Sequence, residues 1–274
     1  MNIAGKAIVI TGAASGIGRA LALECARRGA RLLLADIDEE HLASACAEAA
    51  AAGATCHGLS TDTGNEQDLF ALAEEAHLRL GGADIVVNNA GVTLVSPVES
   101  LTTVDAQWLM NINFWGVVHG CRAFLPQLRQ RPQALLVNIS SIFAMVSVPT
   151  QSMYHAAKAA VRGFSDSLRL ELAGSPVQVL CVHPGGIRTR IVRDARIVDL
   201  AGVARSADEL ARNFEGLART TAEQAALAII GAIESGQPRL LIGRDAKVAD
   251  FLYRLAPTKV SGWYAALTRR RRGG

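Results

Sequence analysis

The sequence predicts a doubly wound α/β domain, in which a parallel sheet of about seven strands is covered by helices on both faces. Two observations support this fold class. Short, β-branched apolar runs alternate with longer amphipathic segments, and the apolar runs have no polar face, as expected for strands that are buried on both sides. A glycine-rich turn also joins the first apolar run directly to the first amphipathic segment.

Seven segments have the composition of buried strands, and one of them, near Thr55–Leu59, is weaker than the others. Because a helix-like segment separates nearly every pair, we expect the strands to run parallel. The predicted strands are, in order, Ala7–Ile10, Arg31–Ala35, Thr55–Leu59, Ile85–Asn88, Leu135–Ile139, Gln178–His183 and Arg239–Ile242.

Six segments between these strands are predicted to be helical. Gly29 and Gly53 follow the first two of them, at positions typical of helix C-terminal caps. Pro176 and Pro184 bracket the sixth strand and favour breaks there. The predicted helices are Gly16–Arg28, Glu39–Ala52, Glu66–Leu80, Val104–Arg129, Ser152–Leu172 and Thr221–Ser235.

We expect residues 1–250 to form a single domain, followed by a C-terminal extension over residues 251–274. Between residues 187 and 221 the alternation is interrupted by a charged, irregular and only partly helical segment. Ligands of open parallel sheets bind beyond the carboxyl ends of the strands, where this segment begins. It is therefore predicted to form a lid over a substrate pocket.

The composition excludes several classes of protein. With 274 residues, 50% hydrophobic and 19% charged, the chain is expected to fold around a sizeable core. We expect no membrane span, no signal peptide and therefore a cytoplasmic protein. Its cysteines are scattered without metal-ligand spacing, which favours reduced thiols and argues against a zinc or other metal site. They are Cys25, Cys46, Cys56, Cys121 and Cys181.

The net charge of +3 is a property of the C-terminus. Four positive charges come from Arg269, Arg270, Arg271 and Arg272, which leaves the rest of the chain at −1. A near-neutral body gives no support for a nucleic-acid groove. The tail, which begins at Trp263, is predicted to be a solvated basic end; a weak contact with an anionic membrane surface is the alternative.

The first strand leads into the sequence Thr11-Gly-Ala-Ala-Ser-Gly-Ile-Gly18. Gly12, Gly16 and Gly18 permit a tight turn and a close approach of the backbone, and they direct amide groups and a helix N-terminus toward a pyrophosphate. The spacing differs from the commoner Gly-x-Gly-x-x-Gly, and an ordinary glycine-rich turn is the alternative for the motif alone.

Asp36 ends the second predicted strand, eighteen residues after Gly18. A carboxylate at this place binds the adenosine ribose hydroxyls and repels a 2′-phosphate. Ser15 and Ile37 provide no cation for such a phosphate, although Arg19 could do so by folding back. We therefore predict that NAD(H) is preferred over NADP(H).

Tyr154 and Lys158 lie four residues apart on a predicted helix, thirteen and seventeen residues after Ser141. This spacing places the phenol and the ammonium on one helix face, where a lysine cation is expected to lower the tyrosine pKa. Such a tyrosine exchanges a proton with an alcohol or ketone oxygen, and a nearby serine hydroxyl can hold the same oxygen.

Together these motifs resemble the short-chain dehydrogenase/reductase family, in its order and over most of the chain, from residue 5 to about 245. The resemblance implies a Rossmann-like fold, a nicotinamide cofactor and a homodimer or homotetramer that assembles through the helices carrying Asn113 and Tyr154. The matching residues are Thr11–Gly18, Asp62-Thr63, Asn88-Asn-Ala-Gly91, Asn113, Ser141, Tyr154, Lys158 and Pro184-Gly185 with Thr189.

The resemblance assigns four catalytic residues. Tyr154 resembles the general acid/base, and Lys158 resembles the residue that lowers its pKa and binds the nicotinamide ribose. Ser141, rather than Ser140, matches the donor to the substrate oxygen, because the family's serine lies thirteen residues before the tyrosine. Asn113 resembles the helix asparagine that holds a proton-relay water, and Asn111 fits the family spacing less well.

The resemblance also assigns residues around the cofactor. Asp62 resembles the acidic residue that meets the adenine amino group, and Thr63 replaces a commoner apolar residue beside it. Thr189 would hold the carboxamide in the nicotinamide-facing loop, which His183 precedes in place of the usual small or amide residue. The full cofactor set is Thr11, Gly12, Ser15, Gly16, Ile17, Gly18, Asp36, Asp62, Thr63, Asn89, Ala90, Gly91, Tyr154, Lys158, Pro184, Gly185, Ile187 and Thr189.

The function implied by the resemblance is NAD(H)-dependent interconversion of a secondary alcohol and a ketone or aldehyde. The apolar segment Ile142–Pro149, together with Val92, Leu94 and Val95, indicates a hydrophobic substrate pocket, unless these residues simply pack the lid. A catalytically silent NAD-binding regulator and a membrane-surface enzyme for lipid-like substrates are the alternatives. The sequence does not identify the substrate, the direction of reaction or its stereochemistry.

Four aromatic residues near these motifs are interpreted as structural. Adjacent helix residues point to different faces, so His155 is expected to have a packing or surface role rather than a catalytic one. His183 is also expected to be structural. Trp108 and Trp115 are predicted to serve the core or a subunit contact rather than a ligand cage.

Overall fold

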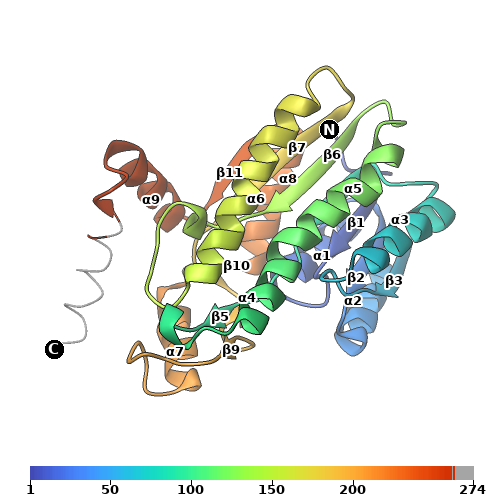
Figure 1. Cartoon of the computed structure of the whole chain (residues 1–274). Helices are drawn as coiled ribbons and strands as arrows, with labels where there is room; N and C mark the ends of the chain where they lie inside the picture. The colour runs from blue at the N-terminus through green and yellow to red at the C-terminus, as the bar shows by residue number, and fades with distance from the viewer. Residues whose placement is uncertain (261, 263–274) are drawn as a thin grey trace.

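A sheet of seven strands forms the centre of the molecule, as predicted (Figure 1). The structure is a computed structural model, and residues 1–260 and 262 are described. The basic tail from Trp263, with Arg269 to Arg272, lies outside the described residues. The strands of the central sheet are β1 (Ala7–Thr11), β2 (Arg31–Asp36), β3 (Cys56–Ser60), β4 (Ile85–Asn88), β6 (Ala134–Ile139), β7 (Val177–Pro184) and β11 (Arg239–Ile242).

The sheet is all parallel, in the order β11-β7-β6-β4-β1-β2-β3. Ile8 of β1 pairs with Leu32 of β2 on one side and with Ile85 of β4 on the other. The chain therefore builds outward in both directions from β1. In such sheets the crevice at the carboxyl ends of the strands where the order reverses, here β1 and β4, is the expected ligand site.

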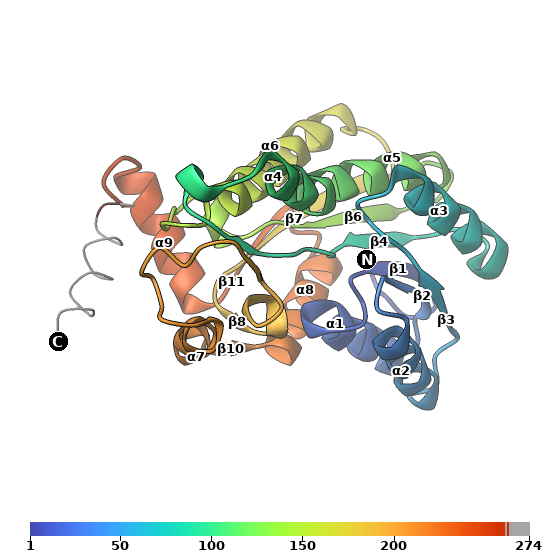
Figure 2. The same cartoon turned by 60° about the horizontal axis from the view of Figure 1, so that its bottom comes forward.

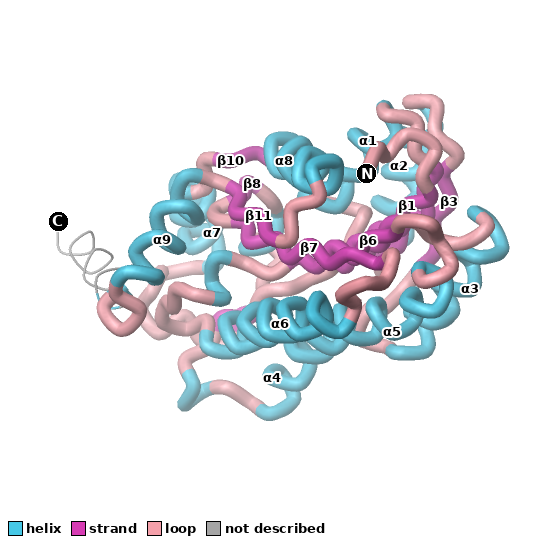
Figure 3. Tube along the Cα trace, turned by 90° about the horizontal axis from the view of Figure 1, so that it is seen from above, coloured by secondary structure: helices cyan, strands magenta, loops and turns pink. Residues whose placement is uncertain are grey.

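Helices cover both faces of the sheet, as Figures 2 and 3 show. One face carries α1 (Gly16–Arg27), α2 (Glu39–Ala51) and α8 (Ala222–Ser235), and the other carries α3 (Glu66–Leu80), α5 (Gly116–Leu128) and α6 (Ser152–Glu171). Alternate strand residues supply the two cores: Ile8 and Ile10 of β1 belong to the first, whereas Ala7 and Val9 belong to the second. This division explains why the strands have no polar face.

The helix predicted at residues 104–129 is present but contains an irregular turn. It consists of α4 (Thr103–Met110), the π-helical turn η2 (Asn111–Trp115) and α5, and the Gly116 amide donates to the Asn111 carbonyl five residues earlier. A π turn inserts one residue and rotates the side chains that follow, and such turns are frequent at functional sites. Periodicity did not reveal it.

Short elements surround the carboxyl edge of the sheet. Inside the expected lid they are β8 (Ile187–Arg188), η4 (Arg190–Val192), β9 (Arg196–Ile197), α7 (Ala207–Leu217) and β10 (Thr220–Thr221). Outside it are β5 (Leu94–Val95), η1 (Val98–Ser100), η3 (Ile142–Ala144) and α9 (Arg244–Leu255). Helix α9 crosses residue 250, so the boundary expected there falls inside a helix.

No helix of residues 1–260 combines the length and the apolar character needed to cross a bilayer. Over the same residues, the side chains of His, Cys, Asp and Glu do not gather in groups of three or more that could hold a metal ion.

The close packing of α5 on β4 depends on Gly120. A Cβ built at this glycine would lie 2.2 Å from Asn88 Oδ1. Asn88 cannot easily move, because its Nδ2 donates to Asn138 Oδ1 at 2.8 Å in the buried core. We predict that Gly120→Ala lowers the free energy of unfolding by about 2 kcal/mol through this overlap, measured by denaturant unfolding.

Gly163→Ala is the matched control, since no described atom lies within 4 Å of the Cβ it would add in the interior of α6. Alanine has the higher helix propensity, so this variant should gain about 0.5–1 kcal/mol. Equal stability of Gly120→Ala and the wild type would contradict the packing argument.

Candidate active site

Two turns that are far apart in sequence are joined at the carboxyl edge of the sheet. The Asn89 and Ala90 amides both donate to Thr11 Oγ1, at 3.0 and 3.1 Å. Asn89 Nδ2 donates in return to the carbonyls of Thr11, at 2.8 Å, and Gly12, at 3.1 Å. The turn after β1 and the turn after β4 are thus fixed against each other at the reversal of strand order.

The glycines of the first turn are required by this close approach. Gly12 has a φ of +66°, and a Cβ there would lie 2.7 Å from Ala90 Cα. A Cβ on Gly18 would lie 2.1 Å from the Gly12 carbonyl oxygen. Both positions are therefore restricted to glycine, which leaves a backbone-lined cradle of the kind that admits a pyrophosphate.

The cradle opens onto the N-terminus of α1. Ser15 is the N-cap residue, and no capping hydrogen bond of its side chain is found within the described residues. First-turn amide groups without such a cap, and the positive end of the helix dipole, favour an anion. A Cβ at Gly16 would touch Thr189 Cγ2, 3.2 Å away, so the turn after β1 meets the loop after β7 at this point. The next residue, Ile17, is half-buried.

Asp36 ends β2, as predicted, and its carboxylate shapes the turn. Its Oδ2 accepts from the Ala14 amide at 2.9 Å, and its Oδ1 accepts from the Asp38 amide at 3.1 Å. The next side chain, Ile37, is 69% exposed. Arg19 does not fold back toward this edge, because its guanidinium bonds Ser44 Oγ at 3.1 Å and pairs with Glu48 on α2.

Asp62 and Thr63 lie just beyond the end of β3. Asp62 is exposed, and its Oδ1 accepts from the Gly64 amide at 2.8 Å, which holds the turn. Thr63 is buried, and a Cβ on Gly116 would lie 2.7 Å from its carbonyl oxygen. Gly116 therefore lets the helix with the π turn pack directly on this strand end.

Asn113 is fully buried in the π turn and pairs with one backbone residue. Its Nδ2 donates to the Val92 carbonyl at 2.9 Å, and its Oδ1 accepts from the Val92 amide at 2.8 Å. A Cβ on Gly91 would lie 3.2 Å from Asn113 Oδ1 and 3.3 Å from Lys158 Nζ. Asn113, Gly91 and Lys158 therefore converge on one point.

The two adjacent serines after β6 have different partners. Ser140 Oγ donates to the Lys158 carbonyl at 2.8 Å and thereby attaches α6 to the sheet. Ser141 Oγ accepts from the Phe143 amide at 3.1 Å and shares a hydrogen bond with Tyr154. Of these two serines, Ser141 is the one for which a hydrogen bond with the phenol is found in the described part of the chain.

Tyr154 and Lys158 lie side by side on α6, and both are buried, with 9% and 3% of their surfaces exposed. Lys158 Nζ lies 5.8 Å from the centroid of the Tyr154 ring and donates to the Ile139 carbonyl at 3.1 Å. Burial lowers the pKa of the lysine to about 8. At neutral pH the ammonium is therefore mainly charged, although desolvated.

The expected lowering of the Tyr154 pKa is wrong. Burial raises the pKa of Tyr154 to about 12, and the hydrogen bond with Ser141 offsets only part of that rise. The physical reason is that a desolvated phenolate costs more than the surrounding groups return. Spacing along a helix predicts the neighbour, but it contains no information about burial.

The loop after β7 is fixed from an unexpected direction. Asp245, at the start of α9, accepts from the Gly186 amide at 2.7 Å, and its Oδ2 lies 2.2 Å from where a Gly185 Cβ would stand. Pro184 and Ile187 are buried on either side. No sequence pattern indicates Asp245, because its partner Gly186 is fifty-nine residues away and the two meet only through the pairing of β11 with β7.

His183 is buried behind the site. Its Nδ1 lies 3.3 Å from the Ser141 carbonyl, and burial lowers its pKa to about 4, so the ring is neutral at physiological pH. His155, which follows Tyr154 in the sequence, is also buried. Of the two roles expected for it, packing is therefore correct and a surface position is wrong. Trp115 is 45% exposed, and Trp108 is half-buried beside Arg196.

The segment after the loop is attached to the body at several points. Strand β9 pairs with β5 of the body, whereas the pairing of β10 with β8 joins the two ends of the segment to each other. The Arg196 guanidinium lies 3.7 Å from the Trp108 ring centroid and 3.0 Å from Asp105 on α4. A hollow lined by Arg188, Thr189 and Glu215 opens where this segment faces the loop.

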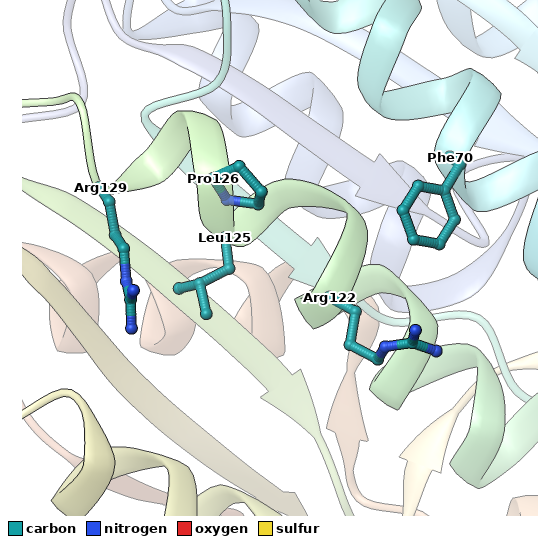
Figure 4. A pocket seen from close by; sticks show the side chains of 5 residues that line it. All are labelled: Phe70, Arg122, Leu125, Pro126 and Arg129. Atoms are coloured by element: carbon teal, nitrogen blue, oxygen red, sulfur yellow. The ribbon is translucent and has the colours of Figure 1, made fainter.

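A second surface hollow lies away from these residues, on the outer face of α3 and α5 (Figure 4). It contains none of the residues that the sequence analysis selected. Its lining is Phe70, Arg122, Leu125, Pro126 and Arg129.

Comparison with known proteins agrees with this geometry. Residues 6–198 match the model of the short chain dehydrogenase family. SadH of Mycobacterium tuberculosis, named as an oxidoreductase, is 40% identical over 253 residues, which cover 92% of this chain and 91% of SadH. The 1-deoxy-11-beta-hydroxypentalenate dehydrogenase of Streptomyces avermitilis is 34% identical, over 90% of this chain and 88% of its own.

A solved structure gives the same result. A short chain dehydrogenase/reductase from Burkholderia phymatum, in complex with NAD, superposes with a TM-score of 0.79 at 32% identity and covers 88% of this chain and 90% of its own. The family typically binds NAD or NADP, and the glycine cradle, the open N-terminus of α1 and Asp36 fit such a dinucleotide. The chain belongs to the short-chain dehydrogenase/reductase family and is an oxidoreductase with its Rossmann-like fold.

Proposed function

We propose that the protein is an NAD(H)-dependent oxidoreductase that interconverts a secondary alcohol and a ketone, or an alcohol and an aldehyde, with Tyr154 as the general acid/base. The observation that carries this proposal is the convergence of Ser141, Tyr154, Lys158 and Asn113 beside the glycine cradle. Four polar groups gathered in a largely apolar environment match the requirements of proton transfer to a substrate oxygen.

In the oxidation direction, Ser141 and Tyr154 hold the substrate hydroxyl, and the phenolate oxygen of Tyr154 removes its proton. Lys158 stabilises the phenolate by charge, since its ammonium is mainly protonated below a pKa of about 8. Asn113 keeps Gly91 and Val92 in place beside that lysine. A nicotinamide cofactor held by the glycine cradle would supply the hydride acceptor for the carbinol carbon.

The charges around Asp36 support a preference for NAD(H). The carboxylate would repel a 2′-phosphate, and Arg19 is already engaged with Ser44 and Glu48. Arg190 is near enough to contribute to the lowered pKa of Asp38, after the larger effect of hydrogen bonds from His41, but Arg190 also pairs with Asp194 at 3.5 Å. The charges around Asp36 therefore favour the neutral 2′-hydroxyl of NAD(H) over the 2′-phosphate of NADP(H).

The substrate is proposed to be fairly apolar. In the segment that follows Ser141, the side chains Ile142, Met145 and Val146 are buried against α9 and so serve packing, whereas Phe143 and Ala144 are half-buried and remain available to a substrate. Leu94 and the ring of Tyr154 belong to a second apolar cluster, which Phe143 joins. The Streptomyces relative is named for a hydroxypentalenate, which is compatible with a substrate that carries a hydroxyl group.

Residues 187–221 are proposed to act as the substrate lid. The ion pair of Arg193 with Glu215, at 2.7 Å, joins two parts of this segment, and the stacking of Arg196 on Trp108 attaches the segment to α4. Such exposed contacts stabilise a closed position only weakly, so opening for substrate exchange is accessible.

A homodimer or homotetramer is proposed for the assembly. Large apolar side chains are exposed on α4, on the π turn and on α6, among them Val104 (72%), Trp115 (45%) and Leu170 (78%). Burial of such side chains between copies would remove them from water.

The proton role predicts the outcome of Tyr154→Phe. Loss of the phenolic oxygen should lower kcat by about 10²–10⁴-fold, the usual contribution of a general acid/base, while the dissociation constant for NADH stays nearly unchanged. Steady-state kinetics on a responsive alcohol and fluorescence titration of NADH measure the two quantities. Near-wild-type kcat would rule out the proposed mechanism, and Ser140→Ala, whose hydroxyl bonds only backbone, is the control that should keep the proton step.

The ribose edge predicts a change of cofactor preference. In the double variant Asp36→Ala/Ile37→Arg, removal of the repelling carboxylate and addition of a cation should raise kcat/KM for NADP(H) relative to NAD(H) by at least about tenfold, or ~1.4 kcal/mol. Initial rates with both cofactors test this. A wild type that prefers NADPH would contradict the assignment of Asp36.

The pH dependence follows from the protonation state of Tyr154. Burial raises its pKa to about 12, so the phenol is protonated near neutrality and must lose its proton to act as a base. We predict that kcat/KM for alcohol oxidation rises as pH increases from about 6 to about 9, because the phenolate fraction grows, whereas kcat/KM for ketone reduction stays nearly constant, because the phenol remains protonated throughout this range. Initial-rate profiles in both directions check the sign; oxidation that slows toward alkaline pH would contradict it.

A further inference from the structure

His155 connects two points of the segment between the candidate catalytic residues. Its Nδ1 lies 2.7 Å from the Phe143 carbonyl oxygen, and its Nε2 lies 2.9 Å from the Val148 amide nitrogen, which donates to it. Both partners are backbone groups of the segment that leaves Ser141 and enters α6 just before Tyr154. We define residues 142–150 as the substrate loop.

The two partners determine the protonation state of the ring. A carbonyl oxygen can only accept a hydrogen bond, so Nδ1 carries the hydrogen; an amide N–H can only donate, so Nε2 carries none. His155 is therefore a neutral imidazole that acts as donor and acceptor at once. Burial lowers its pKa and so favours the same neutral form.

Backbone hydrogen bonds also hold the two ends of the substrate loop. Its first turn, η3, is closed by the Ala144 amide on the Ser141 carbonyl and by the Met145 amide on the Ile142 carbonyl. Near its end, Thr150 has a φ of +67°, which is unfavourable for a β-branched residue, and its carbonyl accepts from the Ser96 amide at 2.9 Å. His155 is the side chain that bridges the first turn and Val148.

The bridge also determines where the Phe143 ring lies. That ring packs edge-to-face on Tyr154, with centroids 6.2 Å apart and an interplanar angle of 85°. It lies against the His155 ring as well, at 5.0 Å. The same aromatic side chain therefore contacts the candidate acid/base and the residue that holds its own carbonyl.

We propose that His155 is a positioning residue, which holds the substrate loop so that Phe143 packs against Tyr154 and completes the substrate site. The inference rests on the proposed function, because it concerns the same site. His155 does not contact the reacting atoms; it acts through the Phe143 carbonyl and the Val148 amide. Its removal should therefore affect substrate binding and turnover while leaving the cofactor cradle intact.

The test compares His155→Phe, which keeps the ring but loses both hydrogen bonds, with His155→Gln, which retains one donor and one acceptor. The variants His77→Phe and His77→Gln, on the exposed surface of α3, are matched controls. In each, kcat and KM for one active alcohol, the NADH dissociation constant and amide hydrogen exchange of residues 142–150 are measured.

We expect His155→Phe to lower kcat/KM at least about tenfold, because two buried backbone groups lose their partners. Exchange in the substrate loop should become faster, and NADH affinity should change less than twofold, ~0.4 kcal/mol. His155→Gln should recover most of kcat/KM, and both His77 variants should match the wild type. A wild-type kcat/KM in His155→Phe, or unchanged exchange in residues 142–150, would overturn the proposal.

Should His155→Phe fail to fold, the pair Phe143→Leu and His155→Gln decides. Phe143→Leu keeps the backbone hydrogen bonds but loses the ring on Tyr154, so kcat should fall with normal exchange in the loop. Wild-type kcat in Phe143→Leu would mean that the ring on Tyr154 does not serve the site. A loss of at least about tenfold in kcat/KM for His155→Gln with normal exchange in the loop would mean that the hydrogen bonds are not what matters. Either result would overturn the proposal. A wild type that oxidises no alcohol would instead refute the proposed function itself.

Discussion

The site depends on the close approach of two backbone turns, one after β1 and one after β4. Thr11 Oγ1 accepts from two amides of the second turn, and Asn89 returns two hydrogen bonds to the first. A side chain at Gly12 or Gly18 would separate them, because its Cβ would overlap backbone atoms. This contact brings the glycine cradle next to Gly91, around which Asn113 and Lys158 converge. The candidate cofactor site and the candidate catalytic residues therefore depend on the same contact between the two turns.

Burial dominates the electrostatics of this site. It raises the pKa of Tyr154, lowers that of Lys158 and keeps His183 and His155 neutral. The described site thus favours uncharged groups. Proton transfer needs a positive charge that stabilises the Tyr154 phenolate, and Lys158 supplies only part of that stabilisation. An oxidised nicotinamide carries a positive charge, so a bound cofactor would favour the phenolate by the same Coulomb effect.

Much of the fold could be predicted because it depends on local patterns. Buried strands, capped helices and the Gly12–Gly18 turn each leave a signal within about twenty residues, and all seven strands of the sheet were found. The prediction of a lowered tyrosine pKa was wrong because desolvation depends on the surrounding fold and not on the spacing of Tyr154 and Lys158. The π turn at Asn113 was missed because one inserted residue barely disturbs helical periodicity.

Contacts between distant segments were missed for a different reason. Asp245 reaches Gly186 only because β11 pairs with β7, and the small strand pairs β5–β9 and β8–β10 are too short to have a composition of their own. His155 was correctly separated from catalysis by its position beside Tyr154 on the helix. Its two backbone partners depend on the path of an irregular loop, which no periodic pattern encodes.

The central claim is that the site moves a hydride between an alcohol carbon and a nicotinamide. The most direct measurement supplies a panel of apolar secondary alcohols, deuterated at the carbinol carbon, together with NAD⁺, and analyses the nicotinamide product by mass spectrometry. The account predicts that deuterium from at least one alcohol appears in NADH, and that Tyr154→Phe nearly abolishes the transfer. NADH that forms without the label, or label transfer that is equally fast in Tyr154→Phe, would contradict it.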